Sequence, residues 1–290
     1  GASFLFIKIG VGEMGPITFA AVRVLVGSAT LAIALRMTHQ ALPRDRRVWL
    51  RFLVMGVLGT AIPFAAISWG TQYIPSGLSA ILNATMPLFT VILAAVWGDE
   101  RLTVWRILGV TVGFAGIVVL TLPKLSGGLQ SSLVGEAAIV VAALSYAVAI
   151  VYARHALVGH PPLVAAFGQI GTSWLVLAPL ALLERPPLAL PSLPVVGSLL
   201  AVGILGTGVA YIIYYGLLQK VGATNTSLVT YITPLFGIFW GFVILDERLS
   251  WHAFAALLLI FTGLLFVNRK PSAARGVAPA PAATPADHEA

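Results

Sequence analysis

Residues 84–102, ATMPLFTVILAAVWGDERL, and residues 231–249, YITPLFGIFWGFVILDERL, share Pro-Leu-Phe and Asp-Glu-Arg-Leu at the same spacing. The correspondence extends without a gap from residues 59–120 to residues 206–267, at a constant shift of 147 positions. Further identities within the two copies pair Gly59-Thr60 with Gly206-Thr207, Gln72 with Gln219, Phe114 with Phe261, and Gly116 with Gly263. Both copies are apolar enough to lie in a membrane. Such a duplication predicts a membrane bundle of two related halves.

The composition indicates a membrane protein rather than a soluble one. Hydrophobic residues make up 59% of the chain, charged residues make up only 9%, and the mean hydropathy is +0.97. Ordinary soluble domains carry about 25% charged residues. The formal charge of +7 does not indicate nucleic-acid binding, because the basic residues are spread between apolar segments. Since the chain has no cysteine, it offers neither a disulfide framework nor a thiolate metal site.

Apolar runs of about 20 residues, the length that crosses the hydrocarbon core as a helix, define the predicted fold. Nine runs fit, near residues 17–35, 52–72, 77–97, 103–122, 133–153, 162–183, 195–218, 223–245 and 250–267. A tenth, residues 2–12, is short and is interpreted as a truncated first helix. The predicted fold class is an all-α membrane protein of ten helices in two domains, residues 1–122 and 123–268. A Pro/Ala-rich tail, residues 269–290, is expected to be disordered and cytoplasmic.

The distribution of basic residues predicts the orientation in the membrane. With a cytoplasmic N-terminus, the inner loops and tail hold twelve Lys and Arg residues and the outer loops hold three. This bias predicts that both termini are cytoplasmic. Because each half has five helices, the second half must enter the bilayer from the opposite side, so the halves are predicted to be inverted repeats. The motifs Asp99 to Arg101 and Asp246 to Arg248 then lie on opposite faces.

These features together resemble the EamA-type branch of the drug/metabolite transporter superfamily. The resemblance is carried by the ten-helix duplication, the opening Gly-Ala-Ser-Phe, and the fourth and ninth segments, which contain Pro87 and Pro234 and end in the two Asp-Glu-Arg-Leu motifs. It covers residues 1–268 and implies a secondary transporter of the bacterial inner membrane, similar to exporters of amino acids and other metabolites. Drugs, sugar phosphates and nucleotide sugars are the alternative solutes that the superfamily implies. The aromatic residue that precedes Gly in the family's first helix would fall before Gly1.

Polar positions on helix faces that the duplication makes equivalent are the predicted substrate-binding residues. In the fourth segment Ser79 and Asn83 share a face, and their equivalents in the ninth are Thr226 and Thr230. The third and eighth segments add Phe64 with Ser68 and Tyr211 with Tyr215, and the sixth and seventh add Tyr146 and Gln169. This neutral, aromatic set would suit an amino acid. Alternatively, the hydroxyl groups bond a carbonyl one turn back, Asn83 joins two helices, and the tyrosines form an interfacial belt.

Ionisable residues at membrane depth need a physical reason, because their charge is costly in lipid. Arg23 could attract a substrate carboxylate or could pair with Glu13 in a structural role. At a shift of 146, Arg23 matches Gln169. Glu136 is expected at the start of the sixth helix, where its charge would meet the helix dipole. Glu13 or Glu136 could also couple transport to protons.

Other conserved spacings within the duplication predict structural roles. Pro87 and Pro234 should kink their helices and could act as hinges. Glu100 and Glu247 end the two helices that carry these prolines, where acid and base can pair, so neither is predicted to be catalytic. Gly109 and Gly113 form a small-residue face, which predicts close helix packing within the bundle or in a homodimer.

The sequence predicts neither enzymatic activity nor a cofactor or metal site. It contains no phosphate-binding loop or nucleophile elbow, and its histidines lack metal-ligand spacing. The expected partners are a small-molecule substrate and the lipid bilayer, without nucleic acid. A membrane-embedded enzyme acting on lipid-linked substrates and a non-transporting receptor are the competing functions.

Overall fold

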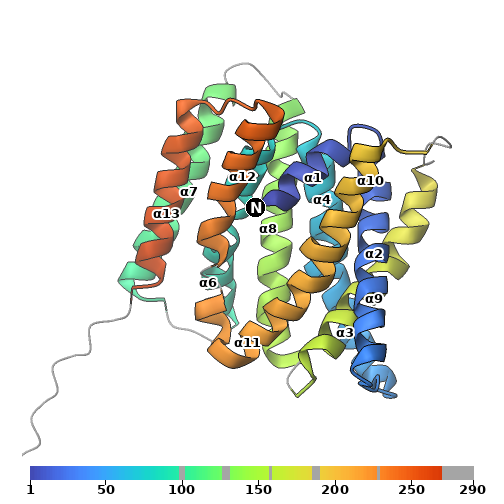
Figure 1. The fold of residues 1–290 in the computed structure, drawn as a ribbon. Coiled ribbons are helices and arrows are strands. Elements are labelled where there is room, and N and C mark those ends of the chain that lie inside the picture. The colour runs from blue at the N-terminus through green and yellow to red at the C-terminus, as the bar shows by residue number, and fades with distance from the viewer. Residues whose placement is uncertain (98–101, 126–130, 157–158, 185–189, 227–228, 270–290) are drawn as a thin grey trace, which may run out of the picture.

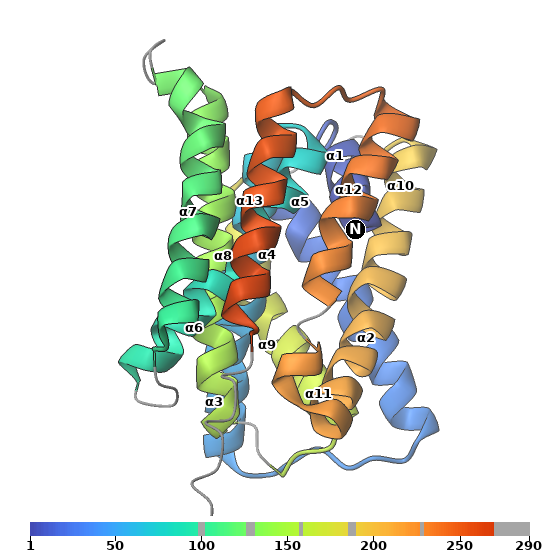
Figure 2. The same cartoon turned by 90° about the vertical axis from the view of Figure 1, so that its left-hand side faces the viewer.

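The computed structural model describes residues 1–97, 102–125, 131–156, 159–184, 190–226 and 229–269, and all regular elements within these ranges are helices. They stand side by side in one bundle (Figures 1 and 2). The helices are α1 (Ala2–Gly10), α2 (Pro16–Met37), α3 (Arg46–Gly56), η1 (Val57–Ala61), α4 (Ile62–Thr71), α5 (Ser76–Asn83), α6 (Met86–Val96), α7 (Val104–Leu125), α8 (Ser131–Ala156), α9 (Pro162–Leu183), α10 (Leu193–Leu200), η2 (Ala201–Val209), α11 (Ala210–Thr226), α12 (Val229–Leu245) and α13 (Trp251–Val267).

The lengths and apolar surfaces of these helices confirm an all-α membrane protein. Seven helical stretches in the described ranges are long and apolar enough to cross a bilayer, and two shorter apolar helices fall in α12 and α13. Large apolar side chains face outward along them, among them Leu182, Leu183, Phe239, Phe242 and Leu258. In water such a surface would be an aggregation site, whereas in lipid it needs no cover. The count of ten spans stays a prediction.

The helix bounds follow the duplication. Helix α9 begins 146 positions after α2, and each helix starts with a proline, Pro16 and Pro162. Helix α13 begins 147 positions after α7. Both shifts found in the sequence therefore correspond to matching helix starts.

Several predicted helix bounds were wrong. Helix α3 begins at Arg46 rather than near residue 52, because the Asp45 carboxylate caps it by accepting the Arg47 N–H at 2.8 Å. Helix α8 begins at Ser131, so Glu136 lies in the second turn rather than at the N-terminal dipole. Helix α11 runs on to Thr226 and α12 begins at Val229, so a ninth helix starting at 223 is also wrong.

The two equivalent prolines have different local effects. Helix α5 ends at Asn83, and α6 restarts at Met86 with Pro87 in its first turn. The proline ring clashes with the carbonyl four residues earlier, which is that of Asn83. Pro234 instead lies inside α12. The expected kink is thus a full break of the helix at Pro87.

Equivalent helices of the two halves pack against each other in opposite directions. A Cβ at Gly109 of α7 would lie 2.5 Å from the Gly263 carbonyl oxygen of α13, and a Cβ at Gly116 would lie 2.9 Å from that of Ala256. Because the residue number rises along α7 while it falls along α13, the two helices are antiparallel. The small-residue face that includes Gly109 is therefore used inside the bundle, and Gly113 packs on Leu88 of α6.

Three glutamates cap helix N-termini, and two of the capped helices, α2 and α10, begin at the upper end of the bundle in Figure 1. Glu184, which follows α9, accepts the N–H groups of Ile17 and Thr18 at the start of α2, at 3.2 and 2.7 Å. Glu247 accepts the N–H groups of Ser76 and Gly77 at the start of α5, at 2.9 and 3.3 Å.

Glu13 makes the third cap, on the Ser192 N–H before α10, at 2.8 Å. Unpaired N–H groups and the helix dipole favour a carboxylate at each of these positions. Each cap also joins the predicted half of residues 1–122 to the predicted half of residues 123–268.

We predict that Gly109→Leu lowers the stability of the bundle. The added side chain would meet the α13 backbone, and overpacking of this kind costs about 1–3 kcal/mol. Thermal unfolding in detergent measures the effect. Gly197→Leu is the matched control, because a Cβ at Gly197 meets nothing within 4 Å. Equal melting temperatures for the two variants would contradict the packing of α7 on α13.

Candidate functional site

Arg23 of α2 lies buried in the bundle, with 5% of its surface exposed. Its Nε donates a hydrogen bond to the hydroxyl oxygen of Thr207, in the π-helical segment η2, at 2.9 Å. The guanidinium carbon lies 3.6 Å from the ring centroid of Phe64 in α4. A cation at this distance from a ring is stabilised by the quadrupole of the ring. The side chain is thus held by one hydrogen bond and one aromatic face.

Gln169 of α9 makes the corresponding contact in the other half. Its Nε2 donates to the hydroxyl oxygen of Thr60 at 2.9 Å and to the carbonyl oxygen of Gly59 at 3.1 Å. Its Oε1 accepts a hydrogen bond from the Tyr215 hydroxyl, and the Tyr211 hydroxyl donates to the Gly59 carbonyl at 3.2 Å. Every polar atom of the Gln169 amide group therefore has a partner.

The Arg23–Thr207 and Gln169–Thr60 hydrogen bonds are equivalent under the duplication, since Arg23 matches Gln169 and Thr207 matches Thr60. Each bond joins one half of the chain to the other. The two halves therefore build one polar arrangement twice, once around a cation and once around a neutral amide.

Both threonines lie in π-helical turns, which also occupy equivalent places in the two halves. A π turn shifts the backbone bonding pattern and is frequent at functional sites. In η2 the Thr207 hydroxyl donates to the Val202 carbonyl at 2.9 Å, which leaves its lone pairs toward Arg23. Close backbone contact supports the arrangement: a Cβ at Gly203 would lie 3.2 Å from the Arg23 carbonyl oxygen, and one at Gly56 would lie 2.8 Å from that of Gln169.

Two further candidates have buried polar atoms without a hydrogen-bond partner among the described residues, the Ser68 hydroxyl and the Asn83 side-chain oxygen. Ser68 is fully buried one turn after Phe64. Asn83 ends α5 at the break before Pro87. A buried polar atom that the protein does not satisfy calls for an explanation, and contact with a bound solute supplies one.

Ser79 has local partners, and the predicted ninth-helix stripe does not lie on one helix. The Ser79 hydroxyl is bonded locally, to the Pro75 carbonyl at 3.2 Å and to the Thr71 hydroxyl at 3.3 Å. Thr226 closes α11 and Thr230 lies at the start of α12, so they do not share one helix. Their side chains, like the whole of Glu100, lie outside the described residues. Tyr146 of α8 is partly buried and packs against two clusters of buried apolar side chains. One cluster includes Ile139, and the other includes Phe64.

The candidate acidic residues have partners other than Arg23. The Ser192 hydroxyl and backbone N–H both donate to Glu13, and these bonds lower the pKa of the Glu13 carboxyl below its ordinary value. The predicted pairing of Glu13 with Arg23 is therefore not formed. The proposed coupling role of Glu13 stays a prediction. Glu136 is buried and accepts a hydrogen bond from the Thr121 hydroxyl at 3.3 Å.

Lys8 has a structural role that the sequence did not reveal. Its ammonium group donates to the carbonyl oxygens of Thr71, Gln72 and Ile74 at 2.7, 3.4 and 3.0 Å. These carbonyls lie at and just after the end of α4, where intrahelical partners run out. Thr60, Thr207, Glu184 and Ser192 were also missed, although the Gly-Thr identity of the duplication marks the first two.

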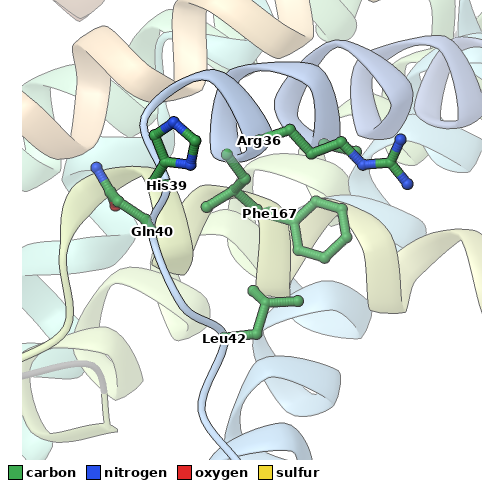
Figure 3. Close-up of a pocket in the computed structure, with 7 residues that line it drawn as sticks. Arg36, His39, Gln40, Leu42 and Phe167 are labelled. Atoms are coloured by element: carbon green, nitrogen blue, oxygen red, sulfur yellow. The ribbon is translucent and has the colours of Figure 1, made fainter.

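An open hollow of about 540 Å³ lies elsewhere, at the C-terminal end of α2 (Figure 3). It is lined by Ala32, Leu35, Arg36, His39, Gln40, Leu42 and Phe167. Arg36 follows Arg23 by 13 residues, which is about 20 Å along a helix. In Figure 3 the guanidinium of Arg36 extends away from His39 and Gln40. None of the predicted binding residues lines this hollow.

A family model and two related proteins that match this chain are all described as transporters. The model of the EamA-like transporter family matches residues 1–122 and 133–269. The chain is 25% identical over 272 residues to the uncharacterized transporter YoaV of Bacillus subtilis, covering 92% of each protein. It is 27% identical over 273 residues to the uncharacterized inner membrane transporter YedA of Escherichia coli K12, covering 92% of this chain and 86% of YedA. A solved crystal structure with 22% identity has the same fold, with a TM-score of 0.63 over 91% of this chain and 96% of that one.

We predict that Tyr215→Phe destabilises the protein by about 1–3 kcal/mol, because the buried Oε1 of Gln169 would lose its donor. Thermal unfolding of the purified protein measures the change. Tyr214→Phe is the control, since the Tyr214 hydroxyl makes no hydrogen bond within the described ranges and its side chain is 36% exposed. A Tyr215→Phe protein as stable as the control would show that this hydrogen bond does not support the site.

Proposed function

The chain belongs to the EamA-like transporter family, as its sequence motifs indicate, and we propose that it is a secondary carrier that exports small metabolites, in particular amino acids. It is a multi-pass membrane protein, and we place it in the bacterial inner membrane with both termini cytoplasmic. The observation that carries the proposal is the duplicated polar centre, in which Arg23 bonds Thr207 and Gln169 bonds Thr60. Polar groups at this depth are costly and mark solute pathways in membrane proteins.

The packing of equivalent helices supports inverted repeats of five helices each. Helices α7 and α13 are antiparallel along the Gly109–Gly263 contact. Helices α2 and α9 are antiparallel as well, since Thr18 at the start of α2 meets Glu184 after the end of α9. Two halves of opposite orientation can exchange conformations, which opens a shared site alternately to each side.

The three glutamate caps support a conformation that is closed at one end of the bundle. Glu13, Glu184 and Glu247 each bond a helix N-terminus of the opposite half. The distribution of basic residues supports an outer location for this end of the bundle. Opening of the outer gate would require these bonds to break, and the helix break at Pro87 could serve as a hinge.

Amino acids are the proposed solutes because the centre combines one cation with neutral hydrogen-bonding groups. The buried Ser68 hydroxyl has no hydrogen-bond partner among the described residues, and the Phe64 ring adds aromatic surface beside Arg23. Sugar phosphates and nucleotide sugars are less suited, since a dianionic phosphate would call for a second cation near Arg23. The sequence carries no nucleotide-binding loop, so the proposed driving force is a solute or ion gradient.

Counterflow into proteoliposomes loaded with an unlabelled amino acid tests the proposal, with radiolabelled amino acids outside. A carrier is expected to give saturable uptake that the internal solute accelerates. Product formation without flux would indicate a membrane-embedded enzyme, and binding without either would indicate a receptor. Either of these results would contradict the proposal.

We predict that Glu184→Gln and Glu247→Gln together loosen the outer gate. Charge-assisted hydrogen bonds are about twice as strong as neutral ones, so both caps would weaken. Because the chain has no cysteine, Ser68→Cys provides a single buried thiol at the centre. Its labelling by an impermeant maleimide from the outside should become several-fold faster in the double variant.

Asp246→Asn is the matched control, because Asp246 lies beside Glu247 but is exposed. Its labelling rate should equal that of the parent protein with Ser68→Cys alone. Equal rates in the double variant and the control would contradict a gate held by these caps.

A further inference from the structure

We propose that Arg23 binds a carboxylate of the transported solute, so that the carrier selects solutes by that group. The inference rests on the proposed carrier function and extends it to a substrate class. It starts from the charge balance at the polar centre, where the duplication provides an internal comparison between Arg23 and Gln169.

The positive charge of Arg23 has no ionic partner among the residues that the structure describes. The acidic side chains near the helix ends are engaged elsewhere, Glu13 by Ser192, Glu184 by Thr18 and Glu247 by Ser76. Glu136 bonds Thr121. A buried charge without a counter-ion is strongly unfavourable, and a partner with the opposite charge relieves that cost.

The geometry leaves one edge of the guanidinium for such a partner. Nε donates to Thr207, and the guanidinium carbon lies over the Phe64 ring. The Nη atoms form no hydrogen bond within the described part of the chain. The two parallel N–H bonds of an arginine edge match the two oxygens of a carboxylate. Since both the plane and the Nε end are fixed, the edge is held in position before the solute arrives.

Gln169 occupies the position equivalent to Arg23 in the other half, and there the side chain serves only to join two helices. It bonds Thr60 as Arg23 bonds Thr207, and both ends of its amide are satisfied by the protein. A neutral amide is therefore sufficient to hold this helix contact. Arg23 has a positive charge and additional N–H donors that the helix contact does not need. Binding of a solute carboxylate would use both.

The buried groups around Arg23 suit the rest of an amino acid. Tyr146 and Tyr211 lie near the guanidinium. The Ser68 hydroxyl, one turn from Phe64, is buried without a partner among the described residues. We infer that the carboxylate pairs with Arg23 while hydroxyl groups and rings contact the remainder of the solute.

Matched ligands in a thermal-shift assay on the purified full chain test the inference without requiring transport. The panel is the protein amino acids and 3-phenylpropanoate, each compared with its own amide, together with phenethylamine. At least one carboxylate is expected to stabilise the wild-type protein at a concentration about tenfold or more below that of its amide. Phenethylamine is expected to have no effect. If no carboxylate acts at lower concentration than its amide, the inference is wrong.

Three variants assign the preference to Arg23. Arg23→Gln should fold, since the equivalent position holds Gln169, but its preference for carboxylate over amide should fall to about one. Arg23→Lys should keep part of the preference, because the ammonium retains the charge without the planar fork. Lys8→Gln removes a cation whose donors the protein already satisfies, so it should keep the full preference. An unchanged preference in Arg23→Gln would overturn the assignment.

Counterflow on the same variants separates the two proposals. Flux that amides and acids inhibit equally would contradict carboxylate selection while leaving the carrier function in place. A carboxylate-selective thermal shift in a protein that gives no flux of any panel member would retain the Arg23 site and contradict the carrier function.

Discussion

In hydrocarbon every polar group must find its partner inside the protein, and the centre of this bundle depends on that constraint. The side chains of α2 and α9 reach across to threonines in π turns of the opposite half, so that Arg23 bonds Thr207 and Gln169 bonds Thr60. These bonds fix how the halves meet. The close approach of Gly56 and Gly203 to the neighbouring backbone is what allows the short side-chain bonds to form.

The chemistry of the centre comes from departures from the duplication rather than from the duplication itself. Where one half has Gln169, the other has a cation, and where one half has Tyr215, the other has Ser68. Tyr215 satisfies the amide of Gln169, whereas Ser68 lacks a partner among the described residues. One copy of the arrangement is therefore complete and structural. The other has unused hydrogen-bonding capacity and a net charge, the properties that a solute-binding group needs.

The duplication and the apolar runs were sufficient to predict the fold class and the family, because lipid imposes helices of nearly fixed length. The predicted start of a helix was wrong where polar residues precede the apolar run, as at Arg46. Arginine side chains can extend their apolar stems along a helix at the membrane interface, so the helix continues beyond the apolar residues. Gln169, Tyr211 and Tyr215 were predicted as binding residues and do share one network. The partner Thr60 lies 109 positions from Gln169, and no local pattern encodes a contact of that separation. The binding role of Ser79 stays a prediction, because the sequence pattern does not distinguish a locally bonded hydroxyl from a free one.

The glutamate caps make the two ends of the bundle chemically unlike, although the scaffold is duplicated. At the shift of 146 that relates α2 to α9, the positions matching Glu13 and Glu184 are Gly159 and Thr38, neither of which is acidic. Only Glu247 has an acidic counterpart, Glu100. A carrier assembled from like halves would rest with equal ease in either conformation. In the proposed carrier, the caps on one end would favour one conformation over the other, and surface substitutions could then tune that preference without altering the proposed solute site.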